Sequence, residues 1–388
     1  MSNLQTIDKQ YVANTYARFP VEIVSGKGSV LVDTDGKEYI DMGSGIAVTS
    51  FGQGDEVWLK AVTEQLGKVQ HTSNLYYTEP CAKLAQLLCE KTGMKKVFFG
   101  NSGAEANECA IKVARKYAQD KKGAEYSTVI TLENSFHGRT LTTLSATGQE
   151  HYHELFNPLT PGFVHTPAND FEALKELALK EKTAGIMMEI VQGEGGVIAL
   201  DADFVKAVAA FCKKQDIVLV IDEVQTGNGR TGEMYAYMHY GIEPDVVTTA
   251  KGLGGGLPIG AALLGEKVEN VLGFGDHGST FGGNPVCCAG AVSIVERLNE
   301  DFLKQVKAKS EKIFTALQGA SGVKSVSGLG LMIGIETEKS AKDVVAECMA
   351  NGVLCLTAKT KVRLLPPLNI PDDLLDKAIE IIKTACAV

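Results

Sequence analysis

The pattern of hydrophobic and polar positions changes character along the chain. Between about residues 95 and 265, short apolar runs alternate with longer stretches that carry small or apolar residues at helical spacing. One run, IVLVI, is apolar at every position, which suits a parallel strand covered by helices on both faces. This alternation predicts a doubly wound α/β domain. The apolar runs predict strands at residues 96–100, 128–132, 184–191, 217–221 and 246–249.

The flanking regions have a different pattern. Residues 20–50 contain short runs separated by Gly and Asp-Gly turns, which is typical of a small antiparallel sheet. After about residue 285, a long helical segment precedes three further predicted strands. We therefore expect an N-terminal segment (1–50) that contributes to a small domain, a large domain (51–280) and a C-terminal small domain (281–388). The three C-terminal strands are predicted at residues 331–336, 353–356 and 362–365.

Composition and charge narrow the class of protein. The chain of 388 residues is 45% apolar and 22% charged, as in globular proteins, and its net charge is −9. An acidic chain without a basic tract argues against nucleic acid or an anionic membrane as the main partner. No apolar run reaches the ~18 residues of a membrane span. Nine cysteines without a CxxC pair, and an N-terminus without an apolar leader, predict a reduced, cytoplasmic protein with no metal site.

Two GxGxxG matches raise the alternative of an NAD(P)-dependent dehydrogenase. The match at 227–232 follows the predicted strand 217–221, as a dinucleotide-binding loop would. However, DEVQT separates that strand from the first glycine, and Asp222 and Glu223 would face the pyrophosphate. The match at 273–278 is followed by STFGGNP, which does not open a helix. We therefore interpret the match at 273–278 as chance, and we keep the dehydrogenase as the less favoured alternative from a different class of enzyme.

Polar segments follow each predicted strand of the central region. Because parallel strands place their carboxyl ends at one edge of the sheet, these segments are expected to form one site. Between them they supply a helix start, which suits a phosphate, and a carboxylate, which suits a cationic ring. They also supply an amine, which suits a carbonyl group, and an arginine, which suits an anionic substrate. The segments are NSGAE (101–105), SFHGR (135–139), QGEGG (192–196), DEVQ (222–225) and AKGLG (250–254).

Single residues in these segments carry specific chemical hypotheses. Ser102 can cap a helix whose first N–H groups bind a phosphate. Lys251 precedes a glycine-rich run and, in a dry pocket, could lose its proton and act as a Schiff-base amine. Asp222 ends an apolar strand and needs a cationic partner, such as a protonated pyridine nitrogen. Phe136 could stack on that ring, and Arg139 could bind a carboxylate. Each residue alone also has an ordinary structural explanation, so the combination carries the hypothesis.

Taken together, NSGAEAN, SFHGRT, QGEGG, IDEVQTGNGRTG, AKGLGGG and STFGGNP resemble the class III (ω-amino) pyridoxal-phosphate aminotransferases. The resemblance extends from Tyr16 through RLLPPL at 363–368. It implies the fold of type I pyridoxal-phosphate enzymes: a large, mixed but mostly parallel α/β domain that binds pyridoxal 5'-phosphate, a smaller α+β domain, and a homodimer with shared active sites. The presence of Lys251, Asp222 and Arg139 disfavours a non-catalytic relative.

Within this class, the compact length and STFGGNP resemble the acetylornithine aminotransferases of arginine biosynthesis. The resemblance implies transfer of the terminal amino group of N2-acetyl-L-ornithine to 2-oxoglutarate, giving N-acetyl-L-glutamate 5-semialdehyde and L-glutamate. Ornithine, succinylornithine and 4-aminobutyrate aminotransferases share the scaffold and remain alternatives.

The resemblance also implies roles for the residues that contact the cofactor. Lys251 is expected to form the Schiff base and to carry the proton, and Asp222 to pair with the pyridine nitrogen. Gln225 is expected to bond the phenolic oxygen, and Phe136 to cover the ring. Ala104 occupies a position where Thr is common in the family. The remaining cofactor contacts are expected from Ser102, Gly103, Ala104, Glu223, Val224 and, from the other subunit, Thr280.

For the substrates, the resemblance implies two arginines with different tasks. Arg139 is expected to bind the carboxylate far from the reacting amine, and Arg363 to bind the α-carboxylate of glutamate. Glu194 is expected to neutralise Arg363 when acetylornithine enters, since a bare buried arginine would be costly. Ser279 and Tyr16 are expected to lie close to the substrate.

Overall fold

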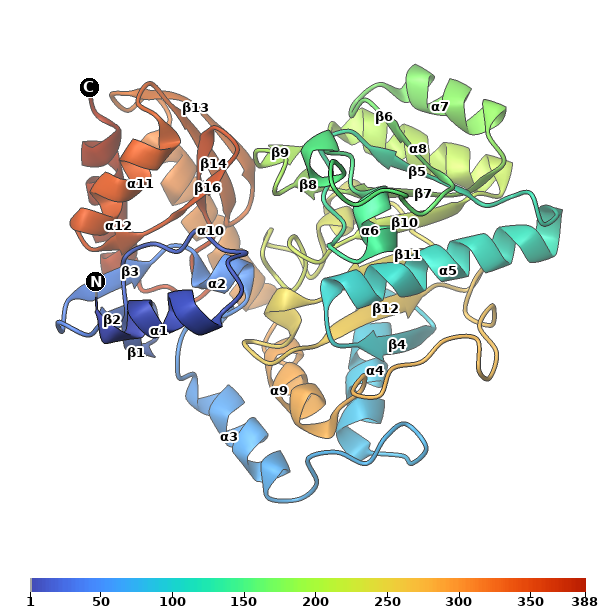
Figure 1. Cartoon of the computed structure of the whole chain (residues 1–388), viewed down its shortest axis with the longest axis horizontal. Helices are drawn as coiled ribbons and strands as arrows, with labels where there is room; N and C mark the ends of the chain where they lie inside the picture. The colour runs from blue at the N-terminus through green and yellow to red at the C-terminus, as the bar shows by residue number, and fades with distance from the viewer. Residues whose placement is uncertain (1) are drawn as a thin grey trace.

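The computed structural model describes residues 2–388 and contains a large α/β part beside a smaller part (Figure 1). The centre of the large part is a seven-stranded sheet in the order β4-β12-β11-β10-β7-β5-β6. Only β12 runs antiparallel to its neighbours β4 and β11, so the sheet is mixed but mostly parallel. Its strands are β4 (Lys96–Gly100), β5 (Thr128–Leu132), β6 (Phe163–Thr166), β7 (Thr183–Glu189), β10 (Val218–Asp222), β11 (Val246–Thr249) and β12 (Gly260–Leu264).

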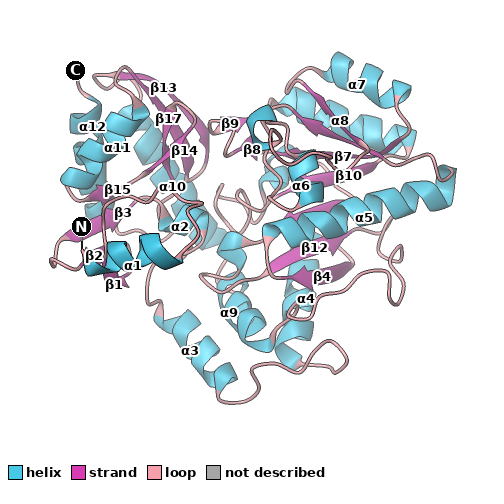
Figure 2. Ribbon diagram, in the orientation of Figure 1, coloured by secondary structure: helices cyan, strands magenta, loops and turns pink. Residues whose placement is uncertain are grey.

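Helices cover both faces of this sheet (Figure 2). In β10, Val218 and Val220 pack in the cluster that includes α5, whereas Leu219 and Ile221 pack in the cluster that includes α8. This double burial explains why the strand is apolar at every position. The helices are α1 (Asn3–Tyr11), α2 (Ser44–Ala47), α3 (Glu56–Leu66), α4 (Glu79–Thr92), α5 (Gly103–Lys122), α6 (Leu141–Ala146), α7 (Phe171–Lys180), α8 (Ala202–Gln215), α9 (Pro285–Val295), α10 (Glu300–Leu317), α11 (Ala341–Ala350) and α12 (Asp372–Cys386).

The smaller part is built from both ends of the chain. Strand β15 pairs in parallel with β3, with Val353 opposite Ile40, so the N-terminal segment lies beside the C-terminal region (Figure 1). A second sheet has the order β13-β14-β17-β16. The strands outside the large sheet are β1 (Ile23–Lys27), β2 (Val30–Asp33), β3 (Glu38–Asp41), β8 (Val191–Gln192), β9 (Ile198–Ala199), β13 (Val323–Leu329), β14 (Met332–Thr337), β15 (Val353–Leu354), β16 (Leu356–Ala358) and β17 (Lys361–Leu364).

The fold-class prediction is confirmed, with two corrections of detail. The strand predicted at 184–191 is divided into β7 and β8. The strand predicted at 353–356 is two short strands in different sheets, because the chain passes from one sheet to the other at Cys355. The domain boundaries remain a prediction. Helix α9 falls within the predicted C-terminal domain, but it packs against α3 and α4, which fall within the predicted large domain. Among residues 2–388, no helix is both long and apolar enough to cross a membrane.

Candidate active site

A cavity of about 450 Å³ lies at the carboxyl ends of the parallel strands. Four of the five segments that the sequence singled out line it directly. The fifth, QGEGG, reaches the site through Glu194, which bonds Arg363. The predicted residues that line the cavity are Ser102, Gly103, Ala104, Phe136, Arg139, Asp222, Val224, Gln225 and Lys251.

Helix α5 begins at the wall of this cavity. The Ser102 hydroxyl accepts a hydrogen bond from the backbone N–H of Glu105 (3.2 Å), and Glu105 accepts one from the N–H of Asn101 (2.8 Å). The first-turn N–H groups of Gly103 and Ala104 have no acceptor within the helix. A Cβ on Gly103 would lie 2.6 Å from Val224, so glycine permits this close approach. The arrangement suits a phosphate at the positive end of the helix.

Asp222 ends β10 and is 4% exposed. Its Oδ2 lies 2.8 Å from both His137 Nδ1 and Asn107 Nδ2, and its Oδ1 accepts the N–H of Val224 at 3.0 Å. Among residues 2–388, no lysine or arginine forms an ion pair with this carboxylate. A buried carboxylate held in this way suits a protonated ring nitrogen. His137 and Asn107 both lie within the motifs SFHGRT and NSGAEAN, but the sequence assigned neither a role; the signal for Asn107 was a polar side chain on an otherwise apolar helix face.

Lys251 follows β11 with φ of 46°, a conformation that costs energy for a residue with a side chain. Burial lowers the pKa of Lys251 below its ordinary value, and nearby Glu194 acts in the opposite direction. A lysine whose proton is lost more readily is a better nucleophile towards a carbonyl carbon.

Arg363 lies on β17, opposite Gly334, and is 3% exposed. Its Nη1 donates to Glu194 Oε1 at 2.5 Å and to Gln225 Oε1 at 3.3 Å. Burial tends to raise the pKa of Glu194, but attraction to Arg363 outweighs it and holds that pKa below its ordinary value. The Nε of Arg363 is buried and has no hydrogen-bond partner among the described residues. The guanidinium therefore retains capacity for an anion.

Arg139 lies against two aromatic rings on the cavity side. Its guanidinium carbon is 4.6 Å from the centre of the Tyr152 ring and 5.6 Å from that of Phe136. No carboxylate within residues 2–388 forms an ion pair with Arg139, so its charge can serve an anionic substrate. Tyr152 lies in a short 3₁₀-helix (Glu150–Tyr152) 13 residues after Arg139, and nothing in the sequence pattern singled it out.

Glu189 is a further cavity residue that sequence reasoning missed. It ends β7, and its two oxygens accept the N–H groups of Phe136 (2.9 Å) and Gly193 (3.4 Å). Burial, and next the negative charge of Asp222, raise the pKa of Glu189 well above its ordinary value. The Glu189 side chain therefore connects the SFHGR segment (135–139) to the QGEGG segment (192–196).

Besides Glu194 and Arg363, four more predicted residues lie outside the cavity lining. Glu223 points into the protein, where it accepts from Thr226 (2.5 Å) and from the N–H of Tyr237 (2.8 Å), and burial raises its pKa to about 7. Tyr16 is 71% exposed and lines a separate cavity of about 500 Å³. Ser279 lies next to the start of α5 and bonds Asn101 at 3.1 Å, and Thr280 beside it is exposed.

The residues present fit pyridoxal 5'-phosphate on structural grounds. They provide a helix start for a phosphate, a buried carboxylate for a ring nitrogen and a buried amine for an aldehyde. Among residues 2–388, no group of three or more histidine, cysteine or acidic side chains is arranged to hold a metal ion.

Comparisons with known proteins agree with this chemistry. The family model described as aminotransferase class-III matches residues 11–386. The acetylornithine aminotransferase of Haemophilus ducreyi is 53% identical over 98% of this chain and 97% of its own length, and that of Methanocaldococcus jannaschii is 47% identical over 96% and 95%.

Solved structures show the same fold. An ornithine aminotransferase from Toxoplasma gondii superposes with a TM-score of 0.95 at 32% identity, covering 98% of this chain and 94% of that one. An N-acetylornithine aminotransferase from Stenotrophomonas maltophilia gives 0.85 at 32% identity, with coverage of 98% and 97%. The chain belongs to the class III aminotransferases, which depend on pyridoxal 5'-phosphate.

Proposed function

We propose that this enzyme transfers the terminal amino group of N2-acetyl-L-ornithine to 2-oxoglutarate, giving N-acetyl-L-glutamate 5-semialdehyde and L-glutamate. The observation that carries the proposal is the Glu194–Arg363 pair beside Lys251, in a site that also holds the unpaired Arg139. The names of the relatives, which are 43–53% identical over nearly the whole chain, support the same substrate.

The bound cofactor supplies an aldehyde that reacts reversibly with amines and a ring that accepts electrons from the reacting carbon. The first turn of α5 binds its phosphate, and Asp222 keeps the ring nitrogen protonated. His137 and Asn107 hold Asp222 in place from two directions. Lys251 anchors the cofactor, and its Nζ moves the proton between the two carbons that exchange the amine.

The two arginines explain how one site serves two different amines. Acetylornithine and glutamate each carry a carboxylate a few carbons from the reacting carbon, and Arg139 binds it in both cases. Glutamate carries a second carboxylate next to its amine, and Arg363 binds that group. The reacting carbon of acetylornithine carries only hydrogen in place of that carboxylate, so Glu194 stays on Arg363 and prevents a bare buried charge.

The test of this proposal is the amine-donor profile of the purified enzyme. With 2-oxoglutarate as acceptor, kcat/KM is expected to be highest for N2-acetylornithine, compared with ornithine, N2-succinylornithine and 4-aminobutyrate. A higher value for any of the other three would replace the proposed substrate while leaving the mechanism intact.

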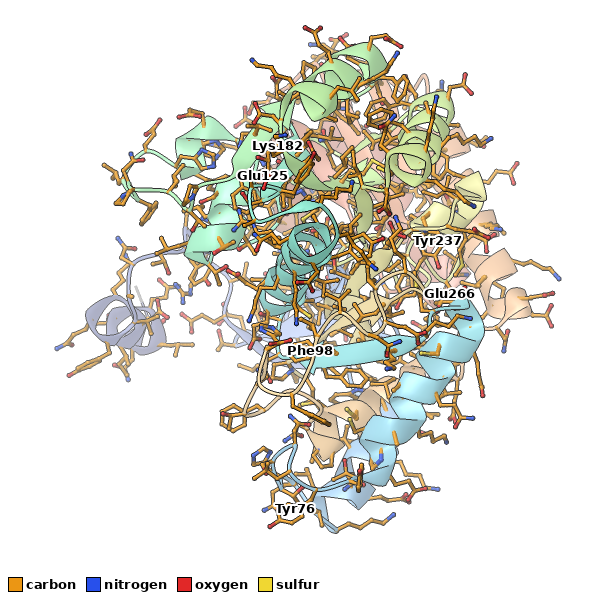
Figure 3. All side chains as sticks on the ribbon, turned by 90° about the vertical axis from the view of Figure 1, so that its right-hand side faces the viewer. Tyr76, Phe98, Glu125, Lys182, Tyr237 and Glu266 are labelled. Carbon is orange, nitrogen blue, oxygen red and sulfur yellow. The ribbon has the colours of Figure 1, made fainter. Side chains whose placement is uncertain are left out.

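We also infer that the enzyme acts as a homodimer in the cytoplasm. Ser279, which precedes Thr280 in the chain, lines a second cavity of about 490 Å³, and an exposed loop that carries Tyr76 and Tyr77 lines the same cavity. In Figure 3, the exposed side chain of Tyr76 lies at the lower end of the molecule. Exposed aromatic side chains around a hollow are typical of a subunit interface. The nine free cysteines fit a reducing compartment.

A further inference from the structure

Arg230 carries a buried positive charge that neither the cofactor nor the substrates explain. It lies in the loop after β10 and is 2% exposed. Among residues 2–388, no carboxylate forms an ion pair with it. Burial lowers the pKa of Arg230 to about 9, and Asp41 acts in the opposite direction, so the guanidinium is charged at neutral pH. A buried charge without a direct counter-ion is costly, and its hydrogen bonds must compensate.

Those hydrogen bonds join three separate parts of the chain. Nη1 donates to the carbonyl oxygens of Leu331 (3.2 Å) and Pro366 (2.5 Å), and Nη2 lies 3.5 Å from the Ser44 hydroxyl. The N–H of Leu331 donates back to the Arg230 carbonyl at 2.9 Å. Leu331 immediately precedes β14, and Pro366 follows β17. Since β14 and β17 are antiparallel neighbours, the guanidinium binds both strands at the same end.

Arg363 lies on this strand pair, opposite Gly334. It is three residues from Pro366, which corresponds to roughly 10 Å along a strand. The loop that carries Arg230 starts directly after Asp222. Within this loop, Asn228 donates a hydrogen bond to the carbonyl of Ala250, which precedes Lys251, at 3.2 Å. One short loop therefore connects the cofactor carboxylate, the lysine and the strand that carries Arg363.

The junction is also tightly packed. Gly330 has φ of 60°, and a Cβ there would lie 2.3 Å from the Cα of Thr231. The planar fork of an arginine can reach two carbonyl groups and a hydroxyl at once, whereas a lysine is a single point of charge.

We propose that Arg230 is a positioning residue that fixes the strand of Arg363 relative to Asp222 and Lys251. It thereby sets the distance between Arg363 and Arg139, and so the preference of the site for a dicarboxylate over a monocarboxylate of the same length. This inference rests on the proposed function, because it uses the two-arginine scheme for glutamate.

The test compares Arg230→Lys with Arg115→Lys in the cofactor-loaded enzyme. Arg115 is a matched control, because it also binds backbone carbonyls, of Ser127 (2.9 Å) and Pro161 (2.7 Å), away from the cavity. Calorimetry measures the binding of glutarate, a five-carbon dicarboxylate without an amine, and of pentanoate, which has one carboxylate. Thermal unfolding of each variant reports the general loss of stability.

We expect wild type and Arg115→Lys to bind glutarate more tightly than pentanoate. In Arg230→Lys, the ratio of the two affinities should fall about tenfold, while the affinity for pentanoate is unchanged. An unchanged preference, or equal loss for both ligands, would overturn the inference. If Arg230→Lys does not fold, Ser44→Ala removes one partner of the guanidinium, and a loss of about threefold is expected; no change would overturn the inference. A wild type that does not prefer glutarate would instead contradict the two-arginine scheme, and this inference with it.

Discussion

Three carboxylates surround Lys251, and each is held by a different kind of partner. The His137 and Asn107 side chains bind Asp222, the Arg363 guanidinium binds Glu194, and two backbone N–H groups bind Glu189. Their pKa values move in opposite directions: at Glu194 attraction to Arg363 outweighs burial and lowers the pKa, whereas at Glu189 burial outweighs the two N–H partners and raises it. Proximity of acidic residues alone therefore does not define their roles.

Replacing Lys251 with alanine tests its role as anchor and proton carrier. Purified wild type is expected to be yellow, and borohydride is expected to fix the cofactor on the Lys251 peptide, as peptide mapping by mass spectrometry would detect. Lys251→Ala should lower the single-turnover rate by at least about 10²–10⁴-fold, the usual contribution of general acid–base catalysis. Lys267→Ala, which removes an ion pair with Asp245, is the control. Retention of the label or of turnover in Lys251→Ala would reject this role.

Replacing Glu194 with alanine tests whether it masks Arg363. The variant leaves Arg363 bare, so the half-reaction with acetylornithine should slow while that with glutamate is spared. A difference of ~1.4 kcal/mol is tenfold in rate, and an unpaired buried charge costs more than this. Single-turnover spectra with each substrate measure the two rates. Equal slowing of both would mean that Glu194 only supports its loop.

At the scale of elements, the start of α5 is the feature most sensitive to a small change. Gly103→Ala places a Cβ 2.6 Å from Val224, which forces the first turn away from the Asp222 segment. The dissociation constant of the cofactor is expected to rise by about tenfold, as equilibrium dialysis would show. Gly67→Ala is the control, because its Cβ would have only ordinary contacts. Unchanged cofactor affinity in Gly103→Ala would argue against a phosphate at this helix start.

How far elements could be predicted depended on their burial. Strands β4, β5 and β11 match their predicted bounds, since each is a short run rich in β-branched or aromatic residues between turns. Strand β12 was missed because GAALL has small residues with low β-propensity, and it is a strand only through its pairing with β4 and β11. Asn107, Glu189 and Arg230 could not be assigned roles, because each acts through contacts with residues distant in the sequence.

At the scale of the whole molecule, the two ends of the chain lie together in the smaller part, beside the large α/β part (Figure 1). The active site draws on both, with Asp222 and Lys251 from the large sheet and Arg363 from the smaller part. The distance between these parts therefore sets the spacing of the substrate-binding groups.

The proposed homodimer predicts a specific effect of Thr280→Ala. If Thr280 reaches the neighbouring subunit's cofactor, loss of its hydroxyl removes one phosphate donor and should weaken cofactor retention severalfold during dialysis. Thr160→Ala, at a threonine away from this loop, is the control. Light scattering should show a dimer for both variants. A fully active monomer would exclude this role for Thr280.

The measurement that tests the central proposal most directly follows a nitrogen label. N2-acetylornithine with ¹⁵N at its terminal amine is incubated with the enzyme, 2-oxoglutarate and unlabelled ammonium, and the glutamate formed is analysed by mass spectrometry. We predict that the label appears in glutamate in a one-to-one ratio with the semialdehyde, and that substrate labelled at the acetylated nitrogen transfers none. Label released as ammonium, or glutamate formed without label, would contradict amino transfer from the terminal position.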